Sequence, residues 1–529
     1  GDTYAAAINA PVSVGDYIST DDGARGEIEF DYGSALRIAP DTQLRFTVLQ
    51  PDHHVLQLAA GTVDLRVFRG LAAHAEIETP SATVRPAGDG SFRVTVTNDG
   101  NTEVTARSGR VDVVTSSGNQ SLEPGPTLLI TGNADRPQIQ TIDAVAFDSF
   151  DSFNRSRDAR VERSHDWAYV DAGFVGADDL DAYGRWSDVP GYGQVWQPTD
   201  QPDGWAPYTT GRWVWEPYYG WSWVDSSPWG YAPYHYGRWF YADANWYWSP
   251  GIAVAAPLYY SAPVAYYPHP VYYRPALVAF FSFGGGGGFG GGLGIGFGNV
   301  GWCALAPSEP FHPWYGSGYG GDRTIVNRTT IINNYGNTYV NGNIDSGNIA
   351  RTYRNVNAPG GAVAVNNGNF ANGNFTHLVR LQRTQLAGAT AVRGVVPVVP
   401  TASNLAFSGH AIEPLATRAP VNTRFARFTT QPKVPFASFA EQQRAVQSVA
   451  VKTYPEHATV FQHPEIQQKY DRPGLITREN VPEEFKPSAT VRGATTNEPA
   501  GARTEERGTY VTKPAVAPAQ ADPFARFSH

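Results

Sequence analysis

Two amino-acid types are nearly missing from this chain of 529 residues, and each absence narrows the class of protein. There is no methionine, not even at position 1, so we expect the numbered chain to begin after a removed segment. A cleaved secretory signal peptide is the natural candidate, and it predicts a location outside the cytoplasm. The single cysteine, Cys303, cannot form a disulfide within one chain, which excludes a disulfide-stapled scaffold. We expect it to be a small buried apolar side chain rather than a reactive or lipidated thiol.

Charged residues are also scarce, at 17% of the chain, where an average soluble domain has roughly 25%. Residues 1–200 hold 30 acidic and 15 basic side chains, whereas residues 321–529 hold 14 acidic and 22 basic ones. An acidic front and a basic tail could attract each other, within one molecule or between neighbours, or both could be solvated surfaces. The positive charges are scattered singly, so we do not expect nucleic acid as a partner.

Motifs that carry catalysis or hold a metal are missing as well. The chain has no HExxH, GxSxG or GxxxxGK[ST] motif, and its histidines do not show metal-ligand spacing. Asp178, Asp179 and Asp181 resemble half of a calcium loop, but the required glycine and distal glutamate are absent. Capping or turn hydrogen bonds explain these aspartates better. We therefore predict that the protein is not an enzyme and has no cofactor or metal.

Aromatic residues, by contrast, are abundant, and they repeat. The phrase Gly-Arg-Trp occurs at 184–186, 211–213 and 237–239. A further tryptophan follows each phrase beyond a turn-like segment, at Trp196, Trp223 and Trp248. Two aromatic stretches joined by a turn indicate a β-hairpin. A hairpin repeated at a fixed period predicts stacked units that share one core.

The front of the chain shows the alternation that is typical of β-strands. In residues 27–32 apolar side chains alternate with acidic ones, as a strand with one buried and one solvent-facing side requires. The same period of two recurs at 44–48, 63–67 and 92–96. Several short strands separated by turns predict a sandwich, barrel or β-roll.

These strands also carry a family resemblance. Residues 14–20, 27–38 and 61–65 look like the extracytoplasmic β domain of the FecR family, and 79–84 with 108–111 fits its continuation. The resemblance implies an extracytoplasmic β fold. In the best-known members this domain follows a membrane helix and a cytoplasmic regulator of an alternative sigma factor. The sequence as given has neither, so a signalling role through a sigma factor is not carried over.

A second resemblance covers the aromatic repeats. Residues 178–186, 229–239, 275–280 and 305–309 resemble a tryptophan-rich domain of unknown function that often follows a FecR-like domain in exported bacterial proteins. The chain departs from that pattern at its 284–292 glycine tract and at Cys303, where an aromatic residue is common. Neither family brings an established catalytic residue.

We therefore predict an all-β protein with four parts. They are a FecR-like β sandwich or roll at 1–142, a Trp/Tyr-rich repeat domain at 143–320, an Asn/Gly-rich β region at 321–394 and an extended Pro/Thr/Ala-rich tail at 395–529. Within the second part we expect a helical linker at 143–163, the hairpin repeats at 184–251 and an apolar glycine-rich loop at 275–300. The tail should hold at most one short helix, at 439–451, where Ser438 and Glu441 can form a capping box.

The aromatic side chains could serve either the core or a ligand. Each Trp or Tyr buries about 150–250 Å², so packing alone can explain them, and the repeat arginines could lie flat on neighbouring rings. Exposed rings would instead form a protein-binding surface or a stacking platform for sugars. The candidates for such contacts are Trp205, Trp213, Trp221, Trp229, Trp239, Trp246, Phe281 and Phe283. We expect Trp221, Trp229 and Trp246 to be the most exposed, because they lie at or beside turns.

The stretch from Ala244 to Ser308 contains a single charged residue, Arg274. Its prolines and glycines make it a poor helix, so we do not predict a transmembrane segment. The glycine tract is either a flexible linker or a surface buried against another copy or another protein.

Taken together, these features predict an exported, non-catalytic structural or assembly protein of the periplasm, the outer-membrane surface or the medium. Its aromatic repeats, its apolar glycine-rich loop and its extended tail would provide contacts with a protein partner or with a second copy. The alternative is a module that binds a cell-envelope glycan, either a polysaccharide or peptidoglycan.

Overall fold

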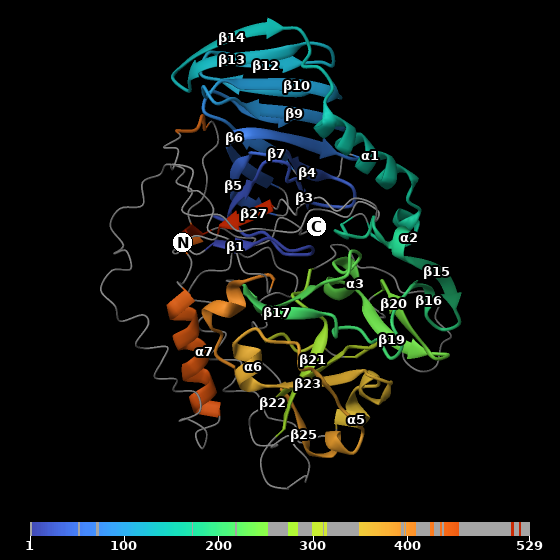
Figure 1. Cartoon of the computed structure of the whole chain (residues 1–529). Coiled ribbons are helices and arrows are strands. Elements are labelled where there is room, and N and C mark those ends of the chain that lie inside the picture. Colours follow the sequence, from blue (N-terminus) through green and yellow to red (C-terminus); the bar gives the residue numbers. More distant parts are fainter. Residues whose placement is uncertain are drawn as a thin grey trace.

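A computed structural model describes most of the first 251 residues and shorter stretches beyond them. The described residues are 3–50, 53–69, 74–171, 173–216, 219–251, 273–283, 299–309, 311–314, 349–392, 396, 398–408, 424–427, 434–435, 439–453, 509–512 and 518–519. A β domain forms one end of the molecule, the aromatic-rich strands form the other, and a long helix runs along the side of the β domain (Figure 1).

The β domain consists of two sheets that share one strand. Its strands are β1 (Thr3–Ala5), β2 (Tyr17–Thr20), β3 (Gly26–Glu29), β4 (Ala35–Ile38), β5 (Gln43–Gln50), β6 (His53–Val67), β7 (His74–Glu78), β8 (Thr83–Pro86), β9 (Gly90–Val96), β10 (Thr102–Ser108), β11 (Val111–Thr115), β12 (Gly118–Leu122), β13 (Thr127–Asn133) and β14 (Arg136–Ile142). The first sheet has the order β1-β27-β2-β5-β6-β7-β8-β11-β12, in which β27 (Thr509–Thr512) comes from the tail. The second has the order β3-β4-β6-β9-β10-β13-β14.

The alternating side chains of these strands meet in one core. Leu44, Phe46, Leu58, Leu65 and Phe92 are completely buried and belong to a single cluster. The long strand β6 passes from one sheet to the other at Gly61, whose φ of +88° and close approach to Thr42 favour glycine there. The predicted β sandwich or roll is confirmed.

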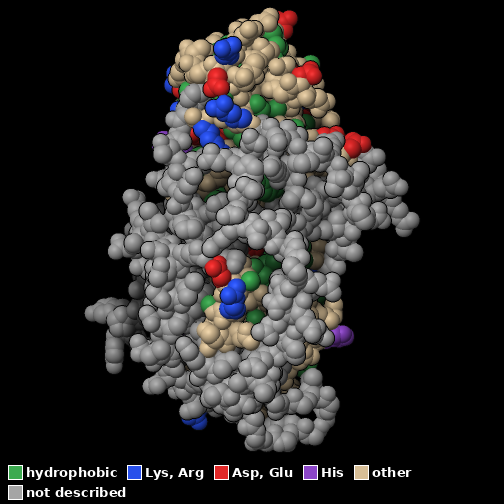
Figure 2. All heavy atoms as spheres, turned by 90° about the vertical axis from the view of Figure 1, so that its left-hand side faces the viewer, with side chains coloured by type: hydrophobic (Ala, Val, Ile, Leu, Met, Phe, Trp, Pro, Cys, Tyr) green, Lys and Arg blue, Asp and Glu red, His purple; other side chains and the backbone are tan. Residues whose placement is uncertain are grey.

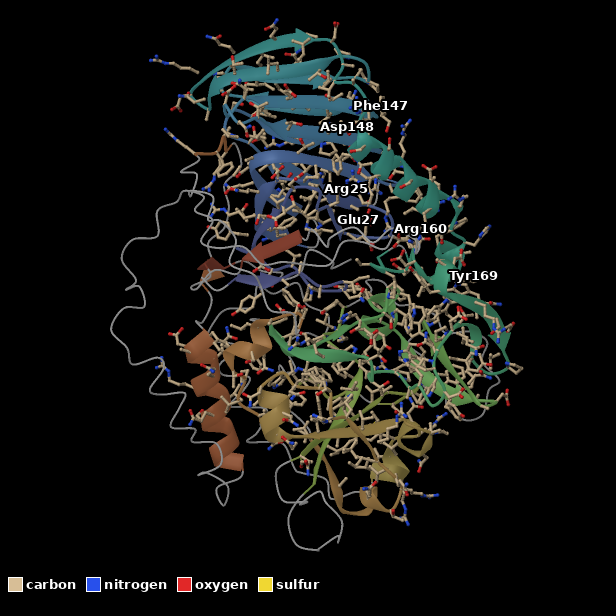
Figure 3. The ribbon with its side chains drawn as sticks, viewed as in Figure 1. Arg25, Glu27, Phe147, Asp148, Arg160 and Tyr169 are labelled. Carbon is tan, nitrogen blue, oxygen red and sulfur yellow. The ribbon has the colours of Figure 1, made fainter. Side chains whose placement is uncertain are left out.

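Helix α1 (Ser149–Arg163) lies on the β domain and is held there by ion pairs. Asp148 caps its N-terminus and forms a capping box with Asp151. Arg93 bonds both carboxylates, at 2.8 and 2.7 Å. Glu27 on β3 faces the helix and pairs with Arg157 (Figure 3). This helix falls within the expected 143–163 linker and ends beside short segments η1 (Asp166–Ala168) and α2 (Leu180–Tyr183).

The three predicted hairpins are present. They are β15 (Gly184–Val189) with β16 (Gly193–Pro198), β17 (Gly211–Glu216) with β18 (Gly220–Asp225), and β19 (Arg238–Ala242) with β20 (Asn245–Ser249). Each places the repeat tryptophan directly opposite the second tryptophan: Trp186↔Trp196, Trp213↔Trp223 and Trp239↔Trp248. Short helix α3 (Ala232–His235) precedes the third hairpin.

The hairpins share a core, as expected, but they do not stack in sequence order. The first and third join in the sheet β15-β16-β20-β19, while β17 and β18 form a two-stranded sheet of their own. The middle hairpin is separated because Val214 and Val224 on its outer face pack into the core of the β domain. Its tryptophans face the aromatic core. The β domain and the aromatic domain therefore share this hairpin.

The expected Asn/Gly-rich region does not form a separate unit in the described residues. Strands β21 (Val278–Phe283) and β22 (Asn299–Ala304), which flank the glycine tract, pair in the sheet β24-β23-β22-β21-β25 with β23 (Ala362–Asn366), β24 (Val379–Arg380) and β25 (Ala389–Val392). Short helices α5 (Ile349–Thr352) and α6 (Asn367–Ala371) and 3-10 turns at Asn355–Asn357, Gln385–Gly388 and Ala402–Leu405 complete this part. Residues 321–348 of that expected region and residues 284–298 of the expected glycine-rich loop lie outside the described residues.

The tail contributes one long helix and short strands. Helix α7 (Phe439–Thr453) coincides with the predicted helix, although Ser438 of the proposed capping box lies outside the described residues. Trp215 Nε1 donates to Gln442 of this helix at 2.8 Å. Strands β26 (Val434–Pro435) and β28 (Pro518–Ala519) pair with each other. Among the described helices, none is both long and apolar enough to cross a membrane.

Candidate interaction site on the β domain

The aromatic residues proposed as contact surfaces are buried. Trp221, Trp229 and Trp246 are 1%, 2% and 5% exposed, so the expectation that they are the most exposed is wrong. Trp221 lies 4.6 Å from the ring of Phe370, and Trp229 lies 5.0 Å from the ring of Trp196. Their positions beside turns did not expose them, because side chains distant in the sequence cover those turns.

The other candidates are also placed inside the molecule. Trp205, Trp213 and Trp239 belong to the same aromatic core, and Phe281 is buried in a neighbouring cluster. Phe283 pairs with Ala389 through its backbone, and its side chain is not among the described ones. None of the seven described rings can meet a partner or a sugar unless the core opens.

The Gly-Arg-Trp phrase has a structural reason that its three copies share. A Cβ at Gly184, Gly211 or Gly237 would collide with the indole of the second tryptophan of the same hairpin. The glycine thus makes room for a large ring on the opposite strand. Among the described residues, the repeat arginines do not stack on rings; Arg185 donates to Gln197 Oε1 at 3.0 Å and Arg212 to the carbonyl oxygen of Gly373 at 3.0 Å.

The chemistry-bearing side chains are also explained by packing. Cys303 is buried, and burial raises the pKa of its thiol well above its usual value, which disfavours the reactive thiolate. Asp179 pairs with Arg160, and Asp181 accepts from the backbone N–H of His165. In the described part of the chain there is no group of three or more His, Cys, Asp or Glu side chains that could hold a metal.

A row of polar side chains crosses the outer face of the first sheet, and we call it the polar ladder: Tyr17, Arg45, Gln57 and Glu78. Each is the direct cross-strand partner of the next, on β2, β5, β6 and β7. Arg45 donates to Tyr17 Oη at 2.9 Å and to Gln57 Oε1 at 2.7 Å, and Gln57 Nε2 donates to Glu78 Oε2 at 2.6 Å. The row is a continuous hydrogen-bonded chain across four strands.

Residues 424–427 of the tail, which we call the docked tail segment, lie over the polar ladder. Arg427 Nε is 3.5 Å from Glu78 Oε2. The backbone N–H of Ala426 donates to the carbonyl oxygen of Thr79, and its own carbonyl accepts from Thr83 Oγ1, both at 2.9 Å.

The same segment is anchored by an aromatic ring and by a second charge. Phe425 is buried against Ala59 and Tyr17. Arg424 pairs with Asp135 at 3.2 Å on the exposed surface. Burial raises the pKa of Glu78, while the hydrogen bond from Gln57 and the charge of Arg427 oppose that rise. The sequence left open whether the basic tail and the acidic front attract each other, and the two pairs at Arg427 and Arg424 show such contacts within one molecule.

Strand β27 lies at the Tyr17 end of the ladder. Its backbone pairs antiparallel with β1 on one side and with β2 on the other. Thr512 stands opposite both Thr3 and Tyr17, so β27 continues the row that the ladder begins. The tail therefore contacts this sheet twice, once through the docked tail segment above it and once as strand β27 within it (Figure 1).

The candidate site can bind extended peptide, and nothing in its arrangement points to catalysis. Sequence reasoning named the tail as a contact element but not these residues. The Arg424-Phe425-Ala426-Arg427 run offered a signal, because it joins two basic side chains to an aromatic anchor.

Acidic and basic side chains also lie beside one another at the β-domain end of the face shown in Figure 2.

Comparisons with known proteins agree with both resemblances. Residues 16–112 match the FecR protein family, and residues 177–309 match a family of unknown function, DUF6600. The two matches confirm the predicted order of a FecR-like domain followed by a tryptophan-rich domain. FecR family proteins are usually envelope-associated, and the match covers the β domain of this chain.

Solved structures add a partial likeness. Two crystal structures of a "putative anti-sigma factor" from Parabacteroides distasonis ATCC 8503 share 23% and 22% identity with this chain, each with a TM-score of 0.22. Each likeness covers 25% of this chain and 60% of that chain. No curated protein matches the sequence.

Proposed function

We propose that this protein is an exported, non-catalytic assembly protein of the bacterial cell envelope. Its working surface is the outer face of the first sheet of the β domain, where the polar ladder and the slot between β1 and β2 hold extended peptide. The partner is a protein, either another copy of this chain or a different envelope component. The aromatic repeats give the surface a rigid support rather than contacting the partner themselves.

One observation carries this proposal: the tail occupies the sheet as an added strand and as a docked segment. Strand addition satisfies backbone N–H and C=O groups that an edge strand would leave open, and side-chain contacts supply specificity. Both elements occur here, with β27 in the sheet and with Phe425 and Arg427 above it. A surface built to hold extended peptide serves assembly rather than chemistry.

The shared hairpin supports the same function. Val214 and Val224 complete the core of the β domain, and Asn9 of the β domain donates to the carbonyl oxygens of Asp225 and Ser227 at 2.9 and 2.7 Å. The peptide-binding sheet is therefore fixed to the aromatic domain by core packing and by hydrogen bonds. Such fixation would keep the acceptor surface in one shape when a partner binds.

The test is the mass of the purified native particle by light scattering, for the full chain and for residues 1–453, which lack β27. We expect the full chain to form a multimer or a heterocomplex, and the truncated chain to form a smaller particle. A monomer in both forms, with no co-purifying partner, would refute the proposed function. Circular dichroism of the truncated chain controls for its folding.

Glycan binding remains a second candidate because of one surface. On the outer face of the sheet β15-β16-β20-β19, the ring of Tyr192 stacks on Phe240 at 3.8 Å, and Phe240 stacks on Tyr247 at 5.5 Å. Gln197, which donates to Asn245 at 2.8 Å, lies on the same face. Rings beside planar polar groups suit sugar rings and their hydroxyls.

This second candidate has its own test. Titration with soluble peptidoglycan fragments should give weaker binding for Tyr247→Ala than for the full chain. Tyr241→Ala, on the opposite face of the same hairpin, is the matched control. Equal binding by both variants, or none by the unmodified protein, would refute a glycan site on this face.

A further inference from the structure

We propose that β27 is an exchangeable strand, and that the slot between β1 and β2 accepts residues 509–512 from a second copy of this chain. This inference rests on the proposed function and names the partner for it. It rests on three observations. The slot is bounded by β1 and β2, and residues 454–508 separate the strand that fills it from α7. The docked tail segment and α7, which precede those residues, are attached to other parts of the molecule.

The slot has a definite register on both sides. Opposite β1, the pairs are Thr3↔Thr512, Tyr4↔Val511 and Ala5↔Tyr510. Opposite β2, they are Tyr17↔Thr512, Ile18↔Val511, Ser19↔Tyr510 and Thr20↔Thr509. Within the described residues β1 pairs with no strand other than β27. If β27 left, β1 would lose its only sheet partner and one side of β2 would be open.

An open slot of this kind must be filled again. Unpaired backbone N–H and C=O groups on a strand edge are a template for another strand. Residues 509–512 of a second copy can adopt the same register as those of the same chain. The contacts in the slot are identical whether β27 comes from its own chain or from another copy. Whether the slot takes β27 of its own chain or of a second copy depends on the length of the connecting segment and on the protein concentration, as in domain swapping.

The sequence between the tail helix and β27 is long enough for either arrangement. Residues 454–508 separate α7 from β27, and a chain of that length spans at most roughly 180–200 Å when fully extended. A segment of that length can reach from α7 of one copy to the slot of a second copy that touches it. A connection of 55 residues is long enough that it does not require the strand to return to its own domain.

The tail that precedes this stretch is attached to its own copy. Arg427 and Phe425 anchor the docked tail segment on the β domain. Val446 of α7 lies in the aromatic core, and Gln442 accepts the Trp215 N–H. A copy can therefore donate β27 while the rest of its tail stays in place. A second copy is the occupant we favour because the only sequence shown in the slot is that of this chain.

A disulfide between matched positions tests the exchange in the full chain. Ser19 is buried and stands opposite Tyr510, and its hydroxyl has no hydrogen-bond partner among the residues that the structure describes. We therefore choose Ser19→Cys and Tyr510→Cys. The native Cys303 is 1% exposed and gives little background. The two single variants, one with an affinity tag, are mixed, oxidised mildly and separated on a non-reducing gel. A chain that carries both substitutions reports whether β27 occupies the slot of its own molecule, because it can form the disulfide at monomer mass.

We expect the mixture to form a covalent dimer with twice the chain's mass of 57.4 kDa, with a yield that rises with protein concentration. Pairing Ser19→Cys with Thr512→Cys is the register control, because a position two residues away lies about 7–8 Å off; it should give much less dimer. An excess of a synthetic peptide of residues 507–514 should reduce the dimer several-fold, and a scrambled peptide should not.

Several outcomes would overturn the inference. A crosslink in the double variant alone, at monomer mass and at every concentration, would show that β27 never leaves its own domain. Absence of the crosslink in both arrangements would show that Tyr510 does not occupy the slot. A multimer in light scattering that fails to crosslink would preserve the proposed function and remove this inference, so the two failures are distinguishable.

Discussion

Replacing Glu27 by Gln tests the electrostatic attachment of α1 to the β domain. The side chain of Glu27 is 6% exposed and bonds Arg37 at 2.6 Å, and it also pairs with Arg157 of the helix. Burial alone would raise the pKa of Glu27, but Arg157 and Arg37 together lower it from 4.5 to about 2. A difference of that size corresponds to about 3 kcal/mol of stability when the carboxylate is ionised.

The sign of this effect fixes its pH dependence. Because the pKa of Glu27 is lower in the folded state than in the unfolded state, its stabilisation is fully present above about pH 4.5. It is lost as pH falls towards 2, where the folded protein also takes up the proton. The Glu27→Gln variant should therefore unfold at lower urea concentration at pH 7, with a deficit of about 3 kcal/mol that shrinks towards pH 2.

Glu162→Gln is the matched control for this prediction. Glu162 lies on the same helix and pairs with Arg66 at 3.4 Å, but its side chain is 56% exposed. Exposed pairs of this kind contribute roughly 0–1 kcal/mol, so the control should differ little from the unmodified protein. A Glu27→Gln deficit no larger than that of the control, or one that does not shrink at low pH, would refute the reasoning.

Three further predictions concern the hairpins, the tail and a buried acid. Gly211→Ala places a Cβ 2.8 Å from the Trp223 ring and should lower the free energy of unfolding by about 1–3 kcal/mol. Gly368→Ala is the control, because its Cβ would meet one oxygen at 3.4 Å. Thermal melting should show a lower transition for the first variant and little change for the second. Phe425→Ala should release the docked tail segment and speed its tryptic cleavage, without moving the main melting transition; an unchanged cleavage rate would contradict the docking. Burial raises the pKa of Asp225 from 3.8 to about 7 despite opposing hydrogen bonds, so stability from this group falls as pH rises between those values. Urea titrations should then show Asp225→Asn gaining stability relative to the unmodified protein from pH 4 to pH 7, and a constant difference would contradict the assignment.

Local patterns predicted the hairpins and the β domain well because strands and turns are coded by neighbouring residues. The alternation in 27–32 and the aromatic stretches around Trp213 and Trp223 each lie within a few residues of their partners. The first and third hairpins are joined by a single backbone pair, Trp196↔Trp248, whose members lie 52 positions apart in the sequence. No local signal distinguishes that pairing from a stack in sequence order.

The exposure of the tryptophans could not be predicted for a similar reason. Trp221 sits beside a turn, yet Phe370 of α6 covers it and Trp314 Nε1 donates to its carbonyl oxygen at 2.8 Å. The candidate site shows the same limit. Arg45 and Gln57 belong to strands that the period of two identifies, but their alignment into a ladder depends on the register of β5 and β6.

The three hairpins show why a repeated sequence need not mean a repeated role. Their inner faces are alike, because the glycine and the paired tryptophans set the same local packing. Their outer faces differ at the residue that follows each Gly-Arg-Trp: Ser187, Val214 and Phe240. Val214 enters the core of the β domain, and Phe240 lies beneath the ring of Tyr192.

The glycine and the paired tryptophans, which the three copies share, therefore form the aromatic core. The residue that differs between the copies determines what the outer face of each hairpin contacts. Val214 commits the middle copy to the β domain and fixes the sheet that carries the polar ladder. It follows that contacts with a partner should be sought outside the shared tryptophans. The sheet that receives β27 is the place in the described chain where backbone and side chains are both arranged for an extended peptide.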